Sequence, residues 1–328
     1  MPESRDALPF RLTFVSSHFE NWKDLIEEEP SPDEVAPRIA AVGGAGGWIL
    51  QTYLFLRRRG YAVEIAGSAP PDGVCLFHID DLGIRSCPAN AFVVVIRPDR
   101  PRSVLGDMQI VQNLRLVQSD RDLFVPYWPQ PGLLPRDPSR GNRVERLGFV
   151  GRMRNLAERF QSAEFQKRLR EIGVEFVVRE DRWWDYRDLD VVLGVRDGNL
   201  NFLNAKPASK LVNAWMAGCP ALVGKEPGFE DLRQSPLDYV TVDSAESVFA
   251  AVETLKSDGE LFSNMVENGL LRALEFRSEP ITDRWVSMLE GPVREAFEVW
   301  SGEAQSRHYA RYLYRCLRSR FPVEEYVR

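Results

Sequence analysis

The residues best suited to chemistry lie in one run, 206–223 (KPASKLVNAWMAGCPALV). Lys206 and Lys210 flank the start of a helix predicted over 207–217, in which proline takes the first position and Ser209 lies in the first turn. A helix N-terminus offers unpaired N–H groups and the positive end of a dipole, both of which attract anions. The run therefore predicts a site where a helix start and two cations meet one diphosphate.

Two segments that follow predicted strands carry further candidates. Arg152 and Arg154 come after Gly151, at the carboxyl end of a strand, where parallel sheets bind ligands. Both arginines can instead be solvated surface charges. The segment 179–186 (REDRWWDY) places Trp183 in an aromatic loop, which suits stacking on a base. Packing of these aromatics in the core is the open alternative.

A glycine loop, 43–47 (GGAGG), precedes a predicted helix that ends at Gly60. Gly44, Gly46 and Gly47 either let a ligand approach the backbone closely or only permit a tight turn. The loop departs from the dinucleotide pattern G-x-G-x-x-G, and no acidic residue ends the next strand. An enzyme that uses NAD is therefore disfavoured.

The elements that must position these residues predict an α/β fold. Short apolar runs alternate with helix-period runs along the whole chain, which is typical of parallel α/β units. The proline-rich part 131–143 is predicted to link two domains, at 1–130 and 144–328. We expect two Rossmann-like domains facing each other across a cleft, with the last helices crossing back. Strands are predicted at 11–16, 61–66, 74–79, 91–97, 146–150, 174–179, 190–195, 220–224 and 239–242, and helices at 47–60, 157–172, 207–217, after Asp243 as a cap, and over 260–320.

The sequence from Phe149 to Arg152 (FVGR), followed by the run 206–223, resembles the donor domain of GT-B glycosyltransferases. In that family the corresponding run is P-S/T-K-L-x-E-y-x-A-x-G-x-P-V-V, and the likeness covers about 147–243. The resemblance implies transfer of a sugar from a nucleoside diphosphate sugar, with Arg152 and Lys210 on the diphosphate. Fixed cations and a helix start can stabilise the leaving diphosphate without a metal.

The chain departs from the family at the helical glutamate that grips the donor ribose, because Asn213 takes its place. An amide binds a hydroxyl more weakly than a carboxylate does. The E-x7-E pair of retaining members is also missing, since Ala205 occupies its first position. The family often places acidic residues near the donor sugar after the next strand, where Glu226 and Glu230 are candidates and a solvated loop is the alternative.

An inverting transfer needs a general base at the carboxyl end of an N-terminal strand. His18 follows the first predicted strand, and Asp80 and Asp81 follow the strand at 74–79, inside which His78 is expected to pack. We place Asp80 ahead of His18 because adjacent carboxylates raise one another's pKa. The same two aspartates also suit a turn or a helix cap.

Composition excludes several other classes. The 42 Lys and Arg against 48 Asp and Glu give a net charge of −6, which disfavours nucleic acid as a partner. Three separated histidines and four cysteines without a CxxC pair predict neither a metal site nor disulfides. The N-terminus has no secretory pattern, and four glycines interrupt the uncharged stretch 39–56, so a cytoplasmic location is expected.

The expected partners are a nucleotide sugar, as co-substrate with no further cofactor, and an acceptor that is a saccharide, a lipid-linked molecule or a protein. A sugar-nucleotide epimerase and a non-catalytic nucleotide-sugar-binding protein are the alternatives. The stretch 305–320 (QSRHYARYLYRCLRSR) predicts an amphipathic helix that either packs against the first domain or makes a weak peripheral contact with an anionic membrane.

Overall fold

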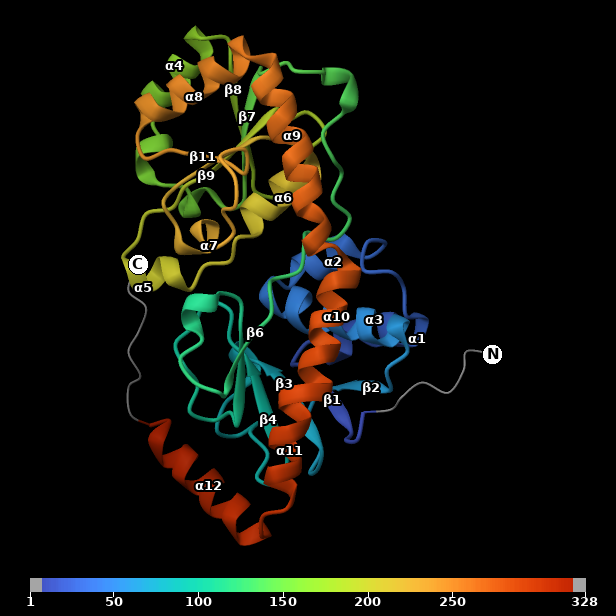
Figure 1. The fold of residues 1–328 in the computed structure, drawn as a ribbon. Coiled ribbons are helices and arrows are strands. Elements are labelled where there is room, and N and C mark those ends of the chain that lie inside the picture. Colours follow the sequence, from blue (N-terminus) through green and yellow to red (C-terminus); the bar gives the residue numbers. More distant parts are fainter. Residues whose placement is uncertain (1–7, 321–328) are drawn as a thin grey trace. The chain divides into compact units, whose positions relative to one another are not determined.

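The structure is a computed structural model that describes residues 8–320, and the chain forms two compact units (Figure 1). Within the described residues, unit 1 holds 8–128 and 278–320, and unit 2 holds 129–277. The sequence-based range 144–328 for the second domain is corrected here, because the helices after Ser278 belong to unit 1. Aromatic contacts account for this return: the Trp285 ring lies 6.3 Å from Trp48, and Phe297 lies 5.2 Å from Phe10.

Unit 1 is built on a six-stranded parallel sheet in the order β2-β1-β3-β4-β5-β6. Its strands are β1 (Leu12–Val15), β2 (Val63–Ala66), β3 (Val74–His78), β4 (Phe92–Ile96), β5 (Met108–Val111) and β6 (Asp122–Phe124). Its helices are α1 (Lys23–Glu28), α2 (Ala36–Ala41), a π-helical turn (Gly46–Leu50), α3 (Gln51–Arg59), α10 (Ser278–Met288), a second π-helical turn (Leu289–Val293), α11 (Arg294–Ser301) and α12 (Gln305–Arg318).

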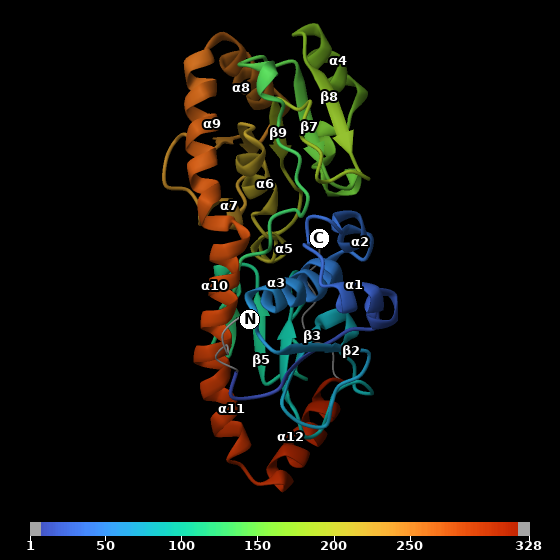
Figure 2. The same ribbon diagram turned by 90° about the vertical axis from the view of Figure 1, so that its right-hand side faces the viewer.

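The central strands of unit 1 are buried on both faces. All five residues of β4, a continuous apolar run, are buried, as expected of a parallel strand covered by helices. Helices α3 and α10 lie side by side in both views (Figures 1 and 2). Helix α3 ends at Gly60, whose φ of 90° is the left-handed conformation that the sequence predicted for a C-terminal glycine.

Unit 2 is built on a five-stranded parallel sheet in the order β11-β10-β9-β7-β8. Its strands are β7 (Arg146–Val150), β8 (Glu175–Arg179), β9 (Val191–Gly194), β10 (Ala221–Val223) and β11 (Val240–Thr241). Its helices are α4 (Ala163–Glu171), α5 (Leu200–Asn204), α6 (Ser209–Ala217), α7 (Pro227–Glu230), α8 (Ala245–Ser257) and α9 (Gly259–Ala273).

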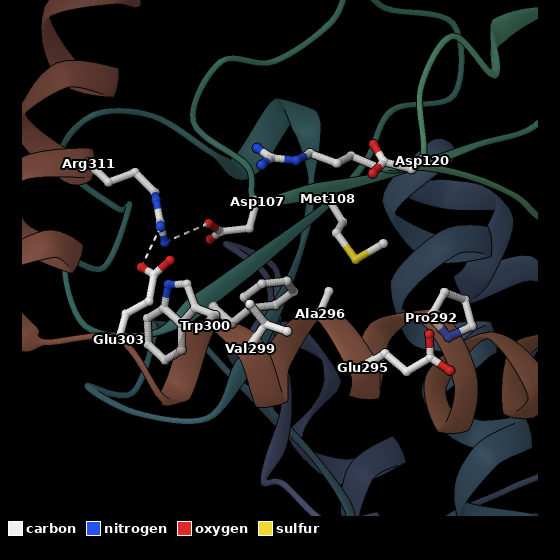
Figure 3. Close-up of a pocket in the computed structure, with 12 residues that line it drawn as sticks. Asp107, Met108, Asp120, Pro292, Glu295, Ala296, Val299, Trp300, Glu303 and Arg311 are labelled. Atoms are coloured by element: carbon white, nitrogen blue, oxygen red, sulfur yellow. Dashed lines mark hydrogen bonds and ion pairs between the residues drawn. The ribbon is translucent and has the colours of Figure 1, made fainter.

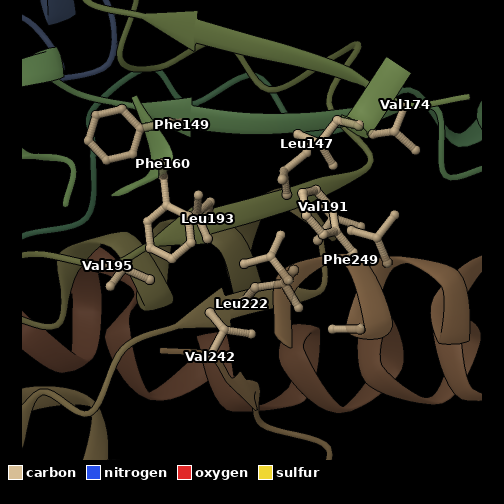
Figure 4. Packing of buried hydrophobic residues seen from close by; sticks show 14 of the residues in the cluster. Leu147, Phe149, Phe160, Val174, Val191, Leu193, Val195, Leu222, Val242 and Phe249 are labelled. Carbon is tan, nitrogen blue, oxygen red and sulfur yellow. The ribbon is translucent and has the colours of Figure 1, made fainter. Parts of the chain in front are cut away.

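The core of unit 2 joins the sheet to the helices that cover it (Figure 4). Leu147 and Phe149 of β7 and Leu193 of β9 are fully buried and pack with Phe160 and Phe249. Because these side chains come from strands and helices far apart in sequence, the cluster fixes the carboxyl ends of β7 and β9 next to each other.

The proline-rich segment is docked on unit 2 along most of its length. Backbone N–H groups of Leu134 and Arg136 donate to Trp184 and Ala217. The buried side chain of Arg136 pairs with Asp190, 2.8 Å away, and Arg140 binds the same carboxylate at 2.7 Å. The segment is therefore an ordered part of unit 2 as well as its connection to unit 1.

Two predicted helix starts are corrected by capping. The helix expected over 157–172 begins as α4 after Ser162, whose hydroxyl accepts the N–H of Phe165. Helix α8 is capped by Ser244 in a reciprocal arrangement with Ser247, not by Asp243. Among residues 8–320, no helix is long and apolar enough to cross a bilayer.

Candidate functional site

In the sheet of unit 2, the order in which the chain adds strands reverses between β7 and β9. The chain adds β8 on one side of β7 and then β9, β10 and β11 on the other side, which is a topological switch point. Open α/β sheets bind ligands in the crevice at the carboxyl ends of such strands. Here those ends are followed by Gly151, Arg196 and Glu226, and Lys210 of α6 reaches the same place.

The ammonium of Lys210 is held at the end of β7. Its Nζ donates to the carbonyl oxygen of Val150 and lies 4.2 Å from the centre of the Phe149 ring. Burial, together with the nearby charge of Arg196, lowers the pKa of Lys210 to about 7, and the charge of Glu226 acts in the opposite direction. A desolvated cation of this kind gains the most from an incoming anion, because an anion restores the charge stabilisation lost with water.

Gly151 makes room for this lysine. Its φ is 140°, which L side chains rarely adopt, and a Cβ atom there would lie 2.7 Å from the Lys210 Nζ. Its N–H donates to Arg179, which fixes the turn after β7. The backbone conformation therefore favours glycine here, and a side chain at this position would push the ammonium aside.

A buried ion pair that the sequence analysis did not identify completes the cluster. The Arg196 guanidinium binds the Glu226 carboxylate, and the Arg196 N–H donates to it at 3.2 Å. Glu226 is only 2% exposed and stands at the start of α7. Arg196 follows β9 and Glu226 follows β10, and the sequence predicted both strands. Their pairing could have been predicted only from the fact that β9 and β10 are parallel neighbours. Glu226 thus orients a cation beside Lys210, while Glu230 of α7 is exposed.

The other predicted cations and Ser209 lie after β7 or near the start of α6. Arg152 is exposed, and within residues 8–320 its guanidinium makes no ion pair. Ser209 is the first residue of α6, two positions later than the predicted helix start. The Lys206 ammonium lies 4.2 Å from the Phe202 ring.

Asn213 is engaged within the fold of unit 2. Its side-chain oxygen accepts the N–H of Gln130 at 3.1 Å, and its amide shares a hydrogen bond with the hydroxyl of Tyr186. Asn213 therefore ties α6 to the chain just before the proline-rich segment. Trp183 is partly exposed, and its buried Nε1–H has no acceptor in the described part of the chain.

In unit 1 the sheet also has a switch point, between β1 and β3. Ser16 and Ser17 follow β1, and their hydroxyls donate to the Asp81 carboxylate at 3.1 and 2.6 Å. Asp80 instead accepts two hydrogen bonds from Arg100, at 3.1 and 3.3 Å. The two predicted base candidates therefore have separate partners. His18 is half-buried beside Trp22, 5.5 Å between ring centres.

His78 ends β3 and is buried, as the sequence predicted, but one of its ring nitrogens lacks a partner. Nδ1 accepts the N–H of Asp80 at 3.3 Å, which leaves the proton of the neutral ring on Nε2. Burial lowers the pKa of His78, although Asp80 and Asp81 act in the opposite direction, so the ring is neutral at pH 7. Its Nε2 is buried without a hydrogen-bond partner among residues 8–320.

The glycine run, expected as a loop before a helix, is itself helical from Gly44 onward, and it covers this nitrogen. A Cβ atom at Gly44 would lie 2.9 Å from the His78 Nε2, so the exposed backbone of Gly44 borders an unused N–H donor. Gly46 and Gly47 are buried, and Cβ atoms there would meet Ile39 at 2.0 Å and the Tyr127 hydroxyl at 2.4 Å. Gly46 and Gly47 thus serve close packing, whereas Gly44 borders a polar group.

Two surface hollows have linings that include neither Lys210 nor His78. One, of about 640 Å³ in unit 2, is lined by arginines and aspartates that pair with one another, such as Arg179 with Asp188. The other, of about 420 Å³ in unit 1, lies beside Trp300 and Arg311 (Figure 3). In the described part of the chain, no group of three His, Cys, Asp or Glu side chains is arranged to hold a metal ion.

No protein-family model matches the sequence, and no curated protein sequence matches it either. Solved structures do match its fold. A sucrose-phosphate synthase from Thermosynechococcus elongatus is 12% identical, with a TM-score of 0.55 over 90% of this chain and 100% of that one. HepE from Anabaena, in complex with UDP and glucose, is 11% identical, with a TM-score of 0.51 over 86% and 100%.

AviGT4, a glycosyltransferase involved in avilamycin A biosynthesis, is 14% identical, with a TM-score of 0.50 over 75% of this chain and 89% of that one. The chain covers only 55% of the length of TarM, to which it is 10% identical with a TM-score of 0.47. With its two parallel α/β sheets, the chain has the two-domain, Rossmann-like GT-B fold.

Proposed function

We propose that this protein transfers a glycosyl group from a nucleoside diphosphate sugar to an acceptor. The observation that carries the proposal is the desolvated ammonium of Lys210 at the switch point of unit 2. The structural neighbours support the class, because AviGT4 is a glycosyltransferase and HepE was solved with UDP and glucose.

In this proposal the diphosphate lies over the turn at Gly151. Lys210 and the exposed Arg152 bind its oxygens, and the start of α6 at Ser209 adds backbone N–H donors. As the bond to the sugar breaks, negative charge grows on the diphosphate, and fixed cations in a partly dry site stabilise it. Arg196 is kept in place by Glu226 and contributes positive potential without needing to touch the ligand.

Unit 1 supplies a polar surface for the second substrate or for the transferred sugar. The Nε2–H of His78 donates to an oxygen that reaches the backbone of Gly44, and Asp80, Asp81 and His18 remain the proposed acid–base candidates. The acceptor, whether saccharide, lipid-linked or protein, and independence of a metal ion are parts of the proposal. The cytoplasm is the proposed location.

One observation favours a second candidate, a nucleotide-sugar-binding protein without transfer activity. Asn213 stands where the resembled family has a carboxylate, and its side chain is occupied by Gln130 and Tyr186. A ribose would then be held without a carboxylate. An epimerase has less support, because the one carboxylate of the cluster, Glu226, is buried against Arg196.

Thermal unfolding with a panel of nucleoside diphosphates tests the proposal. A ligand at a hundred times its dissociation constant adds about 2.7 kcal/mol to the free energy of unfolding. We expect one base to raise the melting temperature of the wild type and of Lys167→Met, a control at an exposed lysine, but not of Lys210→Met. No response to any diphosphate would contradict the proposal, and binding without release of diphosphate in the presence of acceptors would favour the second candidate.

A further inference from the structure

Helix α12 combines an unusual charge with an exposed apolar face. Its sequence contains four arginines and no aspartate or glutamate, and Arg320 follows it, although the chain as a whole carries a net charge of −6. In Figure 1 it lies at the edge of unit 1, after α11. The helix is thus a local basic feature in an acidic protein.

The inner face of α12 is fastened to unit 1. The His308 ring stacks on Trp300 at 3.9 Å, and Arg315 donates to the Asp107 carboxylate at 2.6 Å. Tyr312 packs against the apolar cluster of the sheet, and Arg311 binds Glu303 and Asp107 (Figure 3). Two of the arginines are therefore used to hold the helix in place.

The outer face is left to solvent. Tyr309, Leu313, Tyr314 and Leu317 are 55%, 45%, 64% and 58% exposed, and their spacing places them on one side of the helix. Arg307, Arg318 and Arg320 are exposed around this row, and within residues 8–320 they make no ion pair. Two leucines are thus flanked by tyrosines and then by unpaired arginines.

We infer that the outer face of α12 docks on the surface of an anionic lipid bilayer. A helix lying in the interface buries leucines at the boundary of the acyl chains, while tyrosine rings sit at the level of the headgroups. Arginine stems extend along the apolar surface and bring their charges to anionic headgroups. This inference concerns a surface distinct from the proposed transfer site and does not depend on it.

A second copy of the chain fits this face less well. In a symmetric dimer the same surface meets itself, so Arg307 and Arg318 would face the arginines of the other copy. No acidic residue of α12 is available to neutralise them. An anionic bilayer complements both the apolar row and the unpaired charge.

Co-sedimentation of the full chain with vesicles tests the inference. We expect binding to vesicles of phosphatidylcholine with added phosphatidylglycerol, and much weaker binding to phosphatidylcholine alone. Leu313→Glu with Leu317→Glu should abolish binding, whereas Leu271→Glu, at an exposed leucine of α9, should leave it unchanged. Arg307→Gln with Arg318→Gln should weaken it about 30-fold, from the usual effect of two basic residues near an anionic surface.

The helix content of each variant, measured by circular dichroism, confirms that α12 stays folded, because its inner-face anchors are untouched. Binding that ignores lipid charge, or that survives the double glutamate variant, would overturn the inference. So would a concentration-dependent dimer in light scattering that the glutamate variant dissociates while vesicles bind neither protein. Since vesicle binding needs no sugar nucleotide, failure here leaves the proposed transfer activity untouched.

Discussion

Replacing Lys210 by methionine should make the protein more stable while removing its affinity for a nucleoside diphosphate. Methionine keeps the unbranched shape of the lysine stem and carries no charge. In the folded protein, burial lowers the pKa of Lys210 from 10.5 to about 7. The folded protein therefore disfavours the charged form of Lys210, which costs stability, and the neutral methionine carries no such cost.

The size of the effect follows from these two pKa values. The full difference corresponds to about 5 kcal/mol below pH 7, as an upper limit because part of the side chain reaches solvent. Near neutral pH, where the folded protein is half deprotonated, the cost is about 4 kcal/mol. Methionine also loses the hydrogen bond to Val150, worth about 1 kcal/mol, so a net gain of about 3 kcal/mol is expected.

The pH dependence of the stability difference between wild type and Lys210→Met tests whether the lowered pKa is its cause. Between the folded and unfolded pKa values, the unfolded chain binds more protons than the folded one, so wild-type stability rises with pH. The advantage of Lys210→Met should therefore shrink to about 1 kcal/mol or less near pH 9. Urea unfolding at the two pH values measures this, and calorimetric titration with the diphosphate identified by the thermal panel measures the lost affinity. Equal or lower stability of the variant near neutral pH, with Lys167→Met unchanged, would refute the reasoning.

Three further results are expected. Gly151→Ala should lower the free energy of unfolding by about 1–3 kcal/mol, because alanine is strained at this φ. It should also lower the affinity for diphosphate, because its Cβ would displace the Lys210 ammonium. Unfolding curves and calorimetric titration measure the two effects, and wild-type values in both would contradict the close approach. Asp190→Asn should destabilise the protein by about 3–5 kcal/mol at neutral pH, since it leaves buried Arg136 without its partner. Burial alone would raise the pKa of Asp190, but hydrogen bonds from Arg140 and Arg136 lower it below 3.8, so the stabilisation by the pair is present above pH 3.8 and is lost as the pH falls through the folded pKa. A variant with wild-type stability near pH 7 would be inconsistent with this pairing. Transferase turnover should persist after dialysis against EDTA, because fixed cations take the part of a metal, and complete loss restored by Mg²⁺ or Mn²⁺ would show that this expectation is wrong.

Strands made of buried apolar runs could be predicted from the sequence. The range 146–150 is identical to β7, and β4 lies one residue inside the predicted 91–97 at each end. Strands β5 and β6 were not predicted, because they are short and include polar residues. These polar side chains are buried in the structure because each has a specific hydrogen-bond partner. Gln109 of β5 bonds Ser103, and Asp122 of β6 binds Arg102.

The site could be predicted only in part. Lys210 and Gly151 could be named as candidates because a helix start and a strand end each have local signatures. The pairing of Arg196 with Glu226 joins residues that are far apart in sequence, so it required the order of strands β9 and β10. The place of His78 in a strand was predicted, but its unused Nε2 depends on the approach of Gly44 from another part of unit 1. The roles assigned to Arg152, Asp80 and the other candidates stay predictions.

The return of the chain to unit 1 at Ser278 has a consequence for the order of events during synthesis. Unit 2 is one continuous stretch and is complete as soon as 129–277 have left the ribosome. Unit 1 cannot complete the packing of Trp48 until α10 arrives with Trp285, although all six strands of its sheet are made first. Domains generally fold as they emerge, and exposed apolar surface invites aggregation in the meantime. The half of the protein translated first therefore finishes folding last, and chains halted before Ser278 should be targets for chaperones through their uncovered first sheet.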